Sequence, residues 1–418
     1  MKLGIVFQGE CRNKDNVVRA VQRMAKEKGY RVGAWKEGMR VVLCPTGYVD
    51  LGWVPVRSFF GRWKITGSCV SVPAGPGFHR AAAELIQALG EKEIKDMEWK
   101  DSTNYLEDPD FEALRRETFE PWLAEQLKQA LEELDRDPEG EVRLFWDEDQ
   151  YWPEKVPGTV VTPVGRFSRQ WLGQRLERGE LSERLFLWNE PGHDARFHRN
   201  CALKRLWEDC YFAPSDRSGE DAQINGLILD ELEKSAQMDP ELPLPVESYR
   251  ELCILDDRGF GLPEDIPELE EEFAPGYHKG EVTQSFDTLR FPLPGVYRYE
   301  WNEDGRGGGG CIWWDEESDS PLWRVSGYRS KNVKAAWNAD LAGFSDVETR
   351  EEPGFSAHWG WKELEQRTDP EKPVYQVLGE VVAGPTLFVF TVTFSLPEER
   401  EDIYARIRRI EAVEREEG

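Results

Sequence analysis

The sequence contains no run of about 18 apolar residues, the length that a membrane-spanning helix requires. Residues 1–10 form a short apolar segment that turns polar at once, which is unlike the apolar core of a secretory signal peptide. We therefore expect a cytoplasmic protein that has no membrane as a partner.

Cysteine and histidine are also sparse. The seven cysteines are an odd number without a Cys-x-x-Cys pair, which excludes an obvious disulfide framework or zinc module. Two of the five histidines, His193 and His198, stand five residues apart and so lie on different faces of a helix. Asp194 and His198 share a face, but a metal site needs three or more converging ligands. We predict neither a metal ion nor another cofactor.

Motifs that assemble a nucleophile, a base and a stabilising group are missing as well. The sequence has no Gly-x-Ser-x-Gly and no kinase motif set. Cys44 and Cys69 precede His79 in the same segment, and a thiolate nucleophile there would need a base or a positive charge nearby. Buried core cysteines are the alternative interpretation. Enzyme activity is left open, and a non-catalytic protein is favoured.

What the sequence has in abundance is acid and aromatic side chains. Its 418 residues include 80 Asp and Glu against 53 Lys and Arg, a net charge of −27, together with 17 tryptophans. The charge is uneven: residues 1–95 carry +8, residues 96–278 carry −25 and residues 279–418 carry −10. Such an uneven distribution of charge is more informative about the binding partners of a protein than about its fold.

The pattern of apolar residues and turn residues predicts an α+β protein of three domains. Residues 1–140 read as an N-terminal α/β sheet-and-helix module with an acidic trailing helix, and residues 141–256 as a mostly helical acidic middle domain. Residues 257–280 read as a linker, and residues 281–418 as an antiparallel sheet with two helices. Helices are predicted over 194–212, 218–237, 246–255, 331–341 and 398–411.

A glycine turn in the first segment, residues 73–80, precedes a predicted helix. Backbone N–H groups and the positive dipole end at a helix start can hold a phosphate or a carboxylate. The candidate anion-binding residues are Gly75, Gly77, His79 and Arg80. The turn lacks the endings of a P-loop and of a dinucleotide fingerprint, and a strand-to-helix turn that merely needs glycine is the alternative.

A second candidate is an acidic and aromatic run in the last domain. Adjacent tryptophans on a strand point to opposite faces, so one of the two is expected in the core and the other at the surface beside the acids. An exposed tryptophan is a good anchor for a protein partner. The predicted partner-binding residues are Trp313, Trp314, Asp315, Glu316, Glu317 and Asp319.

Three stretches, Leu187–Asn189, Pro76–His79 and His358–Trp361, together with the acidic and Trp-rich composition, resemble the immunity proteins of bacterial polymorphic toxin systems. The order and lengths of the C-terminal elements resemble the PsbP-like α+β sandwich. The first resemblance implies a protein that binds and neutralises a cognate basic toxin, and we expect no nucleic-acid partner. An enzyme acting on an anionic substrate in the N-terminal domain, and a scaffold or adaptor, are the alternatives.

Overall fold

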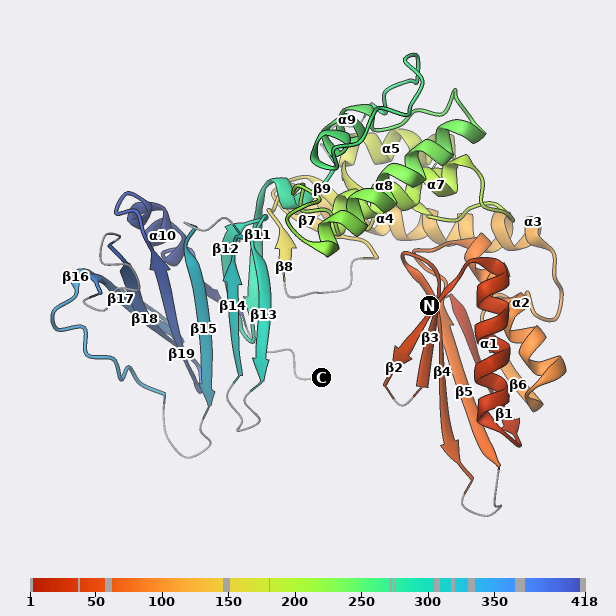
Figure 1. Ribbon diagram of the computed structural model, residues 1–418, viewed down its shortest axis with the longest axis horizontal. Helices are drawn as coiled ribbons and strands as arrows, with labels where there is room; N and C mark the ends of the chain where they lie inside the picture. Colours follow the sequence, from red (N-terminus) through yellow and green to blue (C-terminus); the bar gives the residue numbers. More distant parts are fainter. Residues whose placement is uncertain are drawn as a thin grey trace. The chain divides into compact units, whose positions relative to one another are not determined.

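A computed structural model gives the structure of residues 3–36, 38–56, 62–145, 151–179, 181–270, 273, 275–303, 309–316, 320–329, 335–364 and 373–413. The chain divides into two compact units (Figure 1). Unit 1 comprises Met1–Asp147 and Lys155–Gly276, and unit 2 comprises Glu148–Glu154 and Tyr277–Gly418. Both units combine helices with antiparallel sheets, which confirms the predicted α+β class.

Unit 1 contains a six-stranded antiparallel sheet in the order β2-β3-β4-β5-β1-β6. One face of this sheet packs on two helices, because alternate residues of β1 such as Ile5 and Phe7 share a core with Val17 and Val21 of α1. The opposite face is open, and Val6 on it is 58% exposed. The elements are β1 (Gly4–Cys11), α1 (Lys14–Lys28), β2 (Arg31–Trp35), β3 (Gly38–Cys44), β4 (Gly47–Pro55), β5 (Trp63–Val70), α2 (Pro76–Lys92) and β6 (Lys95–Asp101).

The rest of unit 1 is mainly helical. A small sheet, ordered β10-β9-β7, adjoins these helices. The elements are α3 (Phe111–Ala113), the π-helical turn η1 (Leu114–Phe119), α4 (Glu120–Arg136), β7 (Glu141–Arg143), β9 (Thr159–Thr162), β10 (Gly165–Ser168), α5 (Arg169–Arg178), α6 (Ser182–Leu185), α7 (Ala195–Glu208), α8 (Gly219–Met238) and α9 (Val246–Leu255).

The predicted central helix is confirmed as α7, and nearly all of its side chains are buried. Its start is fixed by Asp194, whose carboxylate accepts a hydrogen bond from Phe197 N at 2.8 Å. Ser218 caps α8 in the same way through Asp221 N at 3.0 Å. Polar caps thus explain why α7 and α8 begin close to where the sequence predicts them, whereas α9 begins after Pro245 without a side-chain cap.

Part of the predicted middle domain shares the hydrophobic core of the N-terminal module, while α7, α8 and α9 also build a core cluster of their own. Leu185 and Phe186, from the predicted middle domain, lie in the same buried cluster as Phe78 of α2 and Phe119 of η1. No division between the two units falls at residue 140, whereas the division at residue 276 lies inside the predicted linker. Long-range packing of residues 185–188 on the N-terminal module therefore joins what the sequence pattern separates.

Unit 2 is a sandwich of a four-stranded sheet, β20-β12-β11-β8, and a seven-stranded sheet, β13-β14-β15-β19-β18-β17-β16. Phe291 of β12 packs against Trp313 of β14 with ring centroids 5.1 Å apart, so the two inner faces share one core. The elements are β8 (Tyr151–Pro153), the 3-10 turn η2 (Tyr277–Lys279), β11 (Glu281–Phe286), β12 (Leu289–Pro294), β13 (Arg298–Glu303), β14 (Gly309–Trp314), β15 (Leu322–Arg329), β16 (Ser345–Glu352), β17 (Phe355–Glu363), β18 (Tyr375–Ala383), β19 (Thr386–Phe394), α10 (Glu399–Ile407) and β20 (Glu411–Ala412).

The predicted helix over 331–341 is wrong in its described part, because residues 335–341 form no helix. The buried carboxylate of Glu380 instead accepts hydrogen bonds from Asn338 N at 2.7 Å and Ala339 N at 3.0 Å. Trp337 stacks on His358, with ring centroids 4.3 Å apart. These contacts attach residues 337–339 to β17 and β18. The predicted closing helix over 398–411 is shorter than expected, since α10 ends at Ile407 and the strand β20 follows.

Within the described ranges no helix is both long enough and apolar enough to cross a membrane.

Candidate functional site

The predicted anion-binding turn is filled by another part of the chain. Gly75, with a φ of +107°, stands at the N-cap of α2, and Pro76 opens the helix. Gly77 N donates to the carbonyl oxygen of Trp188 at 2.9 Å, and Trp188 N donates to the carbonyl oxygen of Ala74 at 2.8 Å. The free N–H group that an anion would need at this helix start is thus bound to the chain's own backbone.

Close packing explains why the turn contains two glycines. A Cβ atom added at Gly75 would lie 2.7 Å from Trp188 O, and one added at Gly77 would lie 2.2 Å from Trp188 Cδ1. Only glycine allows the backbone of residues 186–190 to approach this closely. Gly75 and Gly77 therefore dock one segment of unit 1 onto another.

His79 lies at the centre of a buried polar network and is 0% exposed. Its Nδ1 is 2.8 Å from Ser71 Oγ, and its Nε2 is 3.0 Å from Thr103 Oγ1 and 3.2 Å from Asp101 Oδ1. Tyr105 packs on the imidazole edge-on. The network joins the end of β5, the first turn of α2 and the end of β6.

Asp101 is the acceptor of this network. Its carboxylate accepts hydrogen bonds from Thr103 N at 2.8 Å and Leu106 N at 3.0 Å, in addition to the contact with His79. Burial alone would raise the pKa of Asp101, but the hydrogen bond and charge of His79 and the two backbone N–H groups outweigh it and lower the pKa to about 2. A serine, a histidine and an aspartate in line are the groups of a hydrolytic triad. Ser71 and His79 are fully buried, however, and their polar atoms bind one another, which is an arrangement that stabilises the fold.

Arg80 lines a pocket of 340 Å³ together with Lys28, Glu84 and His193. Its Nε forms an ion pair with Glu84 Oε1 at 3.0 Å, and its Nη1 donates to the carbonyl oxygen of Pro191 at 3.2 Å. Burial lowers the pKa of His193 to about 4, so its imidazole adds no positive charge at neutral pH. Because Glu84 compensates Arg80, the pocket has no marked preference for an anion.

The two cysteines considered as nucleophiles are buried core residues. Burial raises the pKa of both Cys44 and Cys69 to about 12. A thiol with such a pKa carries almost no reactive thiolate at neutral pH. His198 is hydrogen bonded through Nδ1 to Glu231, and no group of three potential metal ligands gathers anywhere in the part of the chain that the structure describes.

The acidic and aromatic run of unit 2 is divided between the core and the surface. Trp313 is 0% exposed and its Nε1 donates to Gln284 Oε1 at 3.0 Å, so it is a core residue and not an anchor for a partner. Trp314 and Asp315 are half-buried, and Glu316 is exposed. Glu317 and Asp319 lie outside the described residues. The alternation of faces along β14 is thus confirmed, with Trp313 as the inner member of the pair.

A different surface combines exposed apolar groups with a high density of acids. Residues 216–270, which include α8, α9 and the chain after them, hold sixteen Asp and Glu against four Lys and Arg, a formal charge of −12. Ile254 is 74% exposed and Phe260 is 64% exposed, the highest values for large apolar side chains among the described residues. We call residues 216–270 the acidic helical surface (Figure 1, green).

Hydrogen bonds fix the segment that presents Phe260. Arg258 binds Asp230 at 2.9 Å and Glu233 at 2.7 Å, which ties the end of α9 to α8. Gly261 N donates to the hydroxyl of Tyr249 at 2.7 Å, and that hydroxyl donates to Glu233 at 2.9 Å. Phe260 stands between these two attachments. A side chain on such a fixed segment loses little conformational entropy on binding.

The sequence carries a signal for this surface in the residues around Ile254 and Phe260. Glu247, Arg250 and Ile254 follow one another at spacings of three and four, so Ile254 lies on the polar face of its helix. Phe260 stands between two glycines in an acidic segment, where a large aromatic residue has no periodic partner. Neither residue belongs to an apolar stripe, and both are therefore candidates for exposure.

No family model matches this chain, and no curated protein matches its sequence. A solved structure from Bacteroides thetaiotaomicron VPI-5482 is similar over 31% of this chain, with a TM-score of 0.23 and 13% sequence identity. The match spans 47% of that protein's chain, which is less than half of its length.

Proposed function

We propose that this protein binds a basic protein partner through the acidic helical surface and turns over no substrate. The observation that carries the proposal is the position of Ile254 and Phe260, the two most exposed large apolar side chains described, within a segment of charge −12. Large apolar side chains on a rigid support are typical anchors of protein interfaces.

The charges define the chemistry of the partner. Acids that surround an apolar anchor attract a basic surface and speed the encounter, whereas the buried anchor slows dissociation. Three acids of the surface, Asp257, Glu264 and Asp265, are exposed. A cognate basic toxin, as the resemblance to immunity proteins implies, is the partner that we propose.

The first test replaces both anchors, as Ile254→Gln and Phe260→Gln, in the full-length chain. Truncating an interface anchor costs about 2 kcal/mol or more, roughly a 30-fold loss of affinity for each residue. We expect the wild-type protein to capture a basic protein from an extract of its host, and the double variant to retain less than a tenth of it. Affinity capture with mass spectrometry measures both results.

The matched control is Val6→Thr with Val54→Thr, which removes two exposed apolar side chains from the open sheet face of unit 1. Capture by this control should equal that of the wild type. Equal capture by the anchor variant and the wild type would contradict the proposal. Loss of capture only on charge reversal at Asp315 and Glu316 would place the binding surface on unit 2 instead.

A further inference from the structure

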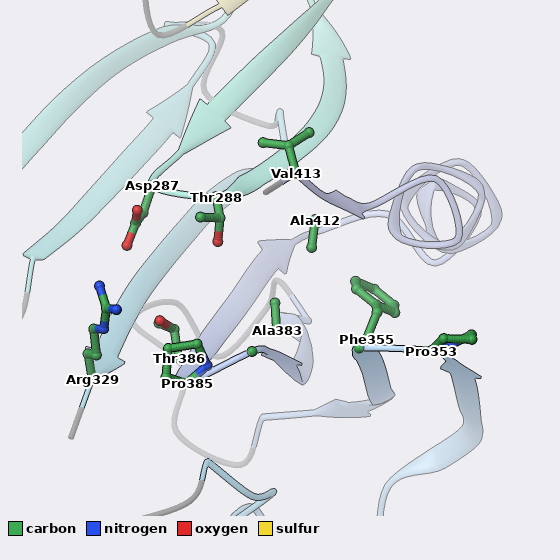
Figure 2. A pocket seen from close by; sticks show the side chains of 12 residues that line it. Asp287, Thr288, Arg329, Pro353, Phe355, Ala383, Pro385, Thr386, Ala412 and Val413 are labelled. Carbon is green, nitrogen blue, oxygen red and sulfur yellow. The ribbon is translucent and has the colours of Figure 1, made fainter. Parts of the chain in front are cut away.

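Unit 2 contains a cleft of about 680 Å³ at one open end of its sandwich (Figure 2). Three turns enclose it: the turn between β11 and β12, the turn between β16 and β17, and the turn between β18 and β19. Ala412 of β20 and the following Val413 complete the wall. The volume lies in the range of small-molecule sites, which are about 300–1,000 Å³.

The register of the large sheet builds the floor of this cleft. Phe355 of β17 pairs with Ala383 of β18, Ala383 pairs with Thr386 of β19, and Thr386 pairs with Arg329 of β15. Directly paired residues of antiparallel strands point to the same face. The four side chains therefore form one row across four strands. The row lies on the face that carries the core, because Trp323 and Val325 alternate with exposed residues on the same strand as Arg329.

The two ends of the row differ in chemistry. Arg329 at one end has no ion-pair partner among the described residues. Phe355 at the other end is 8% exposed and stands beside Pro353, with Pro385 also lining the cleft (Figure 2). Three steps between neighbouring strands, each about 4.8 Å, separate these ends by roughly 14 Å.

Thr386 lies between the ends, next to Arg329. It is only 5% exposed. The side chain lines the cleft (Figure 2). Thr386 and Arg329 thus offer one neutral donor and one charged donor group to the same ligand atom or pair of atoms.

We propose that the cleft binds a small organic monocarboxylate with an apolar body. The carboxylate pairs with the guanidinium of Arg329 and accepts from Thr386, while the body packs along Ala383 toward Phe355. Asp287 lines the opposite wall and points toward Arg329 (Figure 2). A short acyl chain or a phenylalkyl group fits the length of the row.

The test uses 4-phenylbutyrate and its uncharged analogue 4-phenylbutyramide as probes of the full-length protein, with isothermal titration calorimetry. We expect the acid to bind with a Kd below about 1 mM and the amide to bind at least tenfold more weakly. Arg329→Gln should reduce the affinity for the acid at least tenfold and leave that for the amide unchanged. Phe355→Ala should weaken both probes to a similar extent.

Arg324→Gln is the matched control, because Arg324 is exposed on β15 and points to the opposite face of the sheet. Its affinity for the acid should equal that of the wild type. Thr386→Val keeps the shape of the side chain and should weaken the acid, which tests the site should Arg329→Gln fold poorly. Three results would overturn the proposal. They are equal affinities for the acid and the amide, unchanged binding of the acid by both the Arg329 and the Thr386 variants, and no measurable heat of binding at 10 mM probe.

Discussion

Replacing Asp101 with alanine should lower the free energy of unfolding of unit 1 by about 3 kcal/mol or more, because it leaves several hydrogen-bond donors in a buried network without their acceptor. The side chains of Asp101 and His79 are both 0% exposed. The change would leave Thr103 N and Leu106 N without their acceptor and would remove one of the two partners of His79 Nε2. Urea denaturation followed by circular dichroism measures the loss.

Asp108→Ala is the control for this change, because Asp108 lies in the same connection between β6 and α3 but is exposed. It should alter stability by less than about 0.5 kcal/mol. If the two variants are equally stable, Asp101 does not support the fold as its contacts indicate.

The free energy of unfolding should depend on pH in the acidic range because of Asp101. Its pKa is about 2 in the folded protein, below the ordinary value of 3.8. The folded state then binds fewer protons than the unfolded chain between these values, so the contribution of Asp101 is complete above about pH 4 and is lost as the pH falls toward 2. The stability difference between wild type and Asp101→Ala should shrink over that window, and a constant difference would contradict the lowered pKa.

Replacing Gly77 with alanine should destabilise unit 1 by about 3 kcal/mol, at the upper end of the usual cost of overpacking. The added Cβ would lie 2.2 Å from Trp188 Cδ1 and 2.4 Å from the carbonyl oxygen of Glu190. Relief would require residues 186–190 to withdraw, which breaks the hydrogen bond from Gly77 N to Trp188 O. Thermal unfolding and the tryptophan fluorescence near Trp188 report the change.

Gly226→Ala supplies the comparison, since Gly226 lies inside α8 and a Cβ added there meets no atom within 4 Å. Alanine in an exposed helix interior is favoured over glycine by about 0.5–1 kcal/mol. The control should therefore be slightly more stable than the wild type. If the Gly77→Ala protein is as stable as the wild type, the turn accommodates a Cβ atom at no cost in free energy, and its glycines are not needed for docking.

Features set by neighbouring residues could be predicted from the sequence. The helices α7 and α8 follow from apolar spacing and from the polar caps Asp194 and Ser218, which act within one turn, and α9 follows from apolar spacing alone. The alternation along β14 likewise predicts that Trp313 and Trp314 face opposite ways. These predictions depend on local geometry alone, and the structure confirms them.

Features set by distant contacts could not be predicted in this way. The glycine turn carries the pattern of a helix start open to an anion, and only the docking of Trp188, more than 100 residues later, closes it. Trp313 is buried in the core of unit 2, where Gln284 of the other sheet accepts a hydrogen bond from its indole N–H group. The row from Phe355 to Arg329 likewise depends on strand register across four strands, which no short motif encodes.

The association rate of the captured basic partner, measured by stopped-flow at increasing ionic strength, tests the acidic helical surface most directly. The variant is Asp257→Asn with Glu264→Gln and Asp265→Asn, and the control with the same change in net charge is Glu132→Gln with Glu133→Gln and Glu139→Gln on and after α4. At about 0.05 M salt the variant should associate roughly three- to tenfold more slowly than the wild type, and the difference should fade as the Debye length falls toward about 8 Å near 0.15 M. The control should behave as the wild type, since its acids lie outside the surface. An association rate that is indifferent to salt, or one that the control lowers as much as the variant, would contradict binding through this surface.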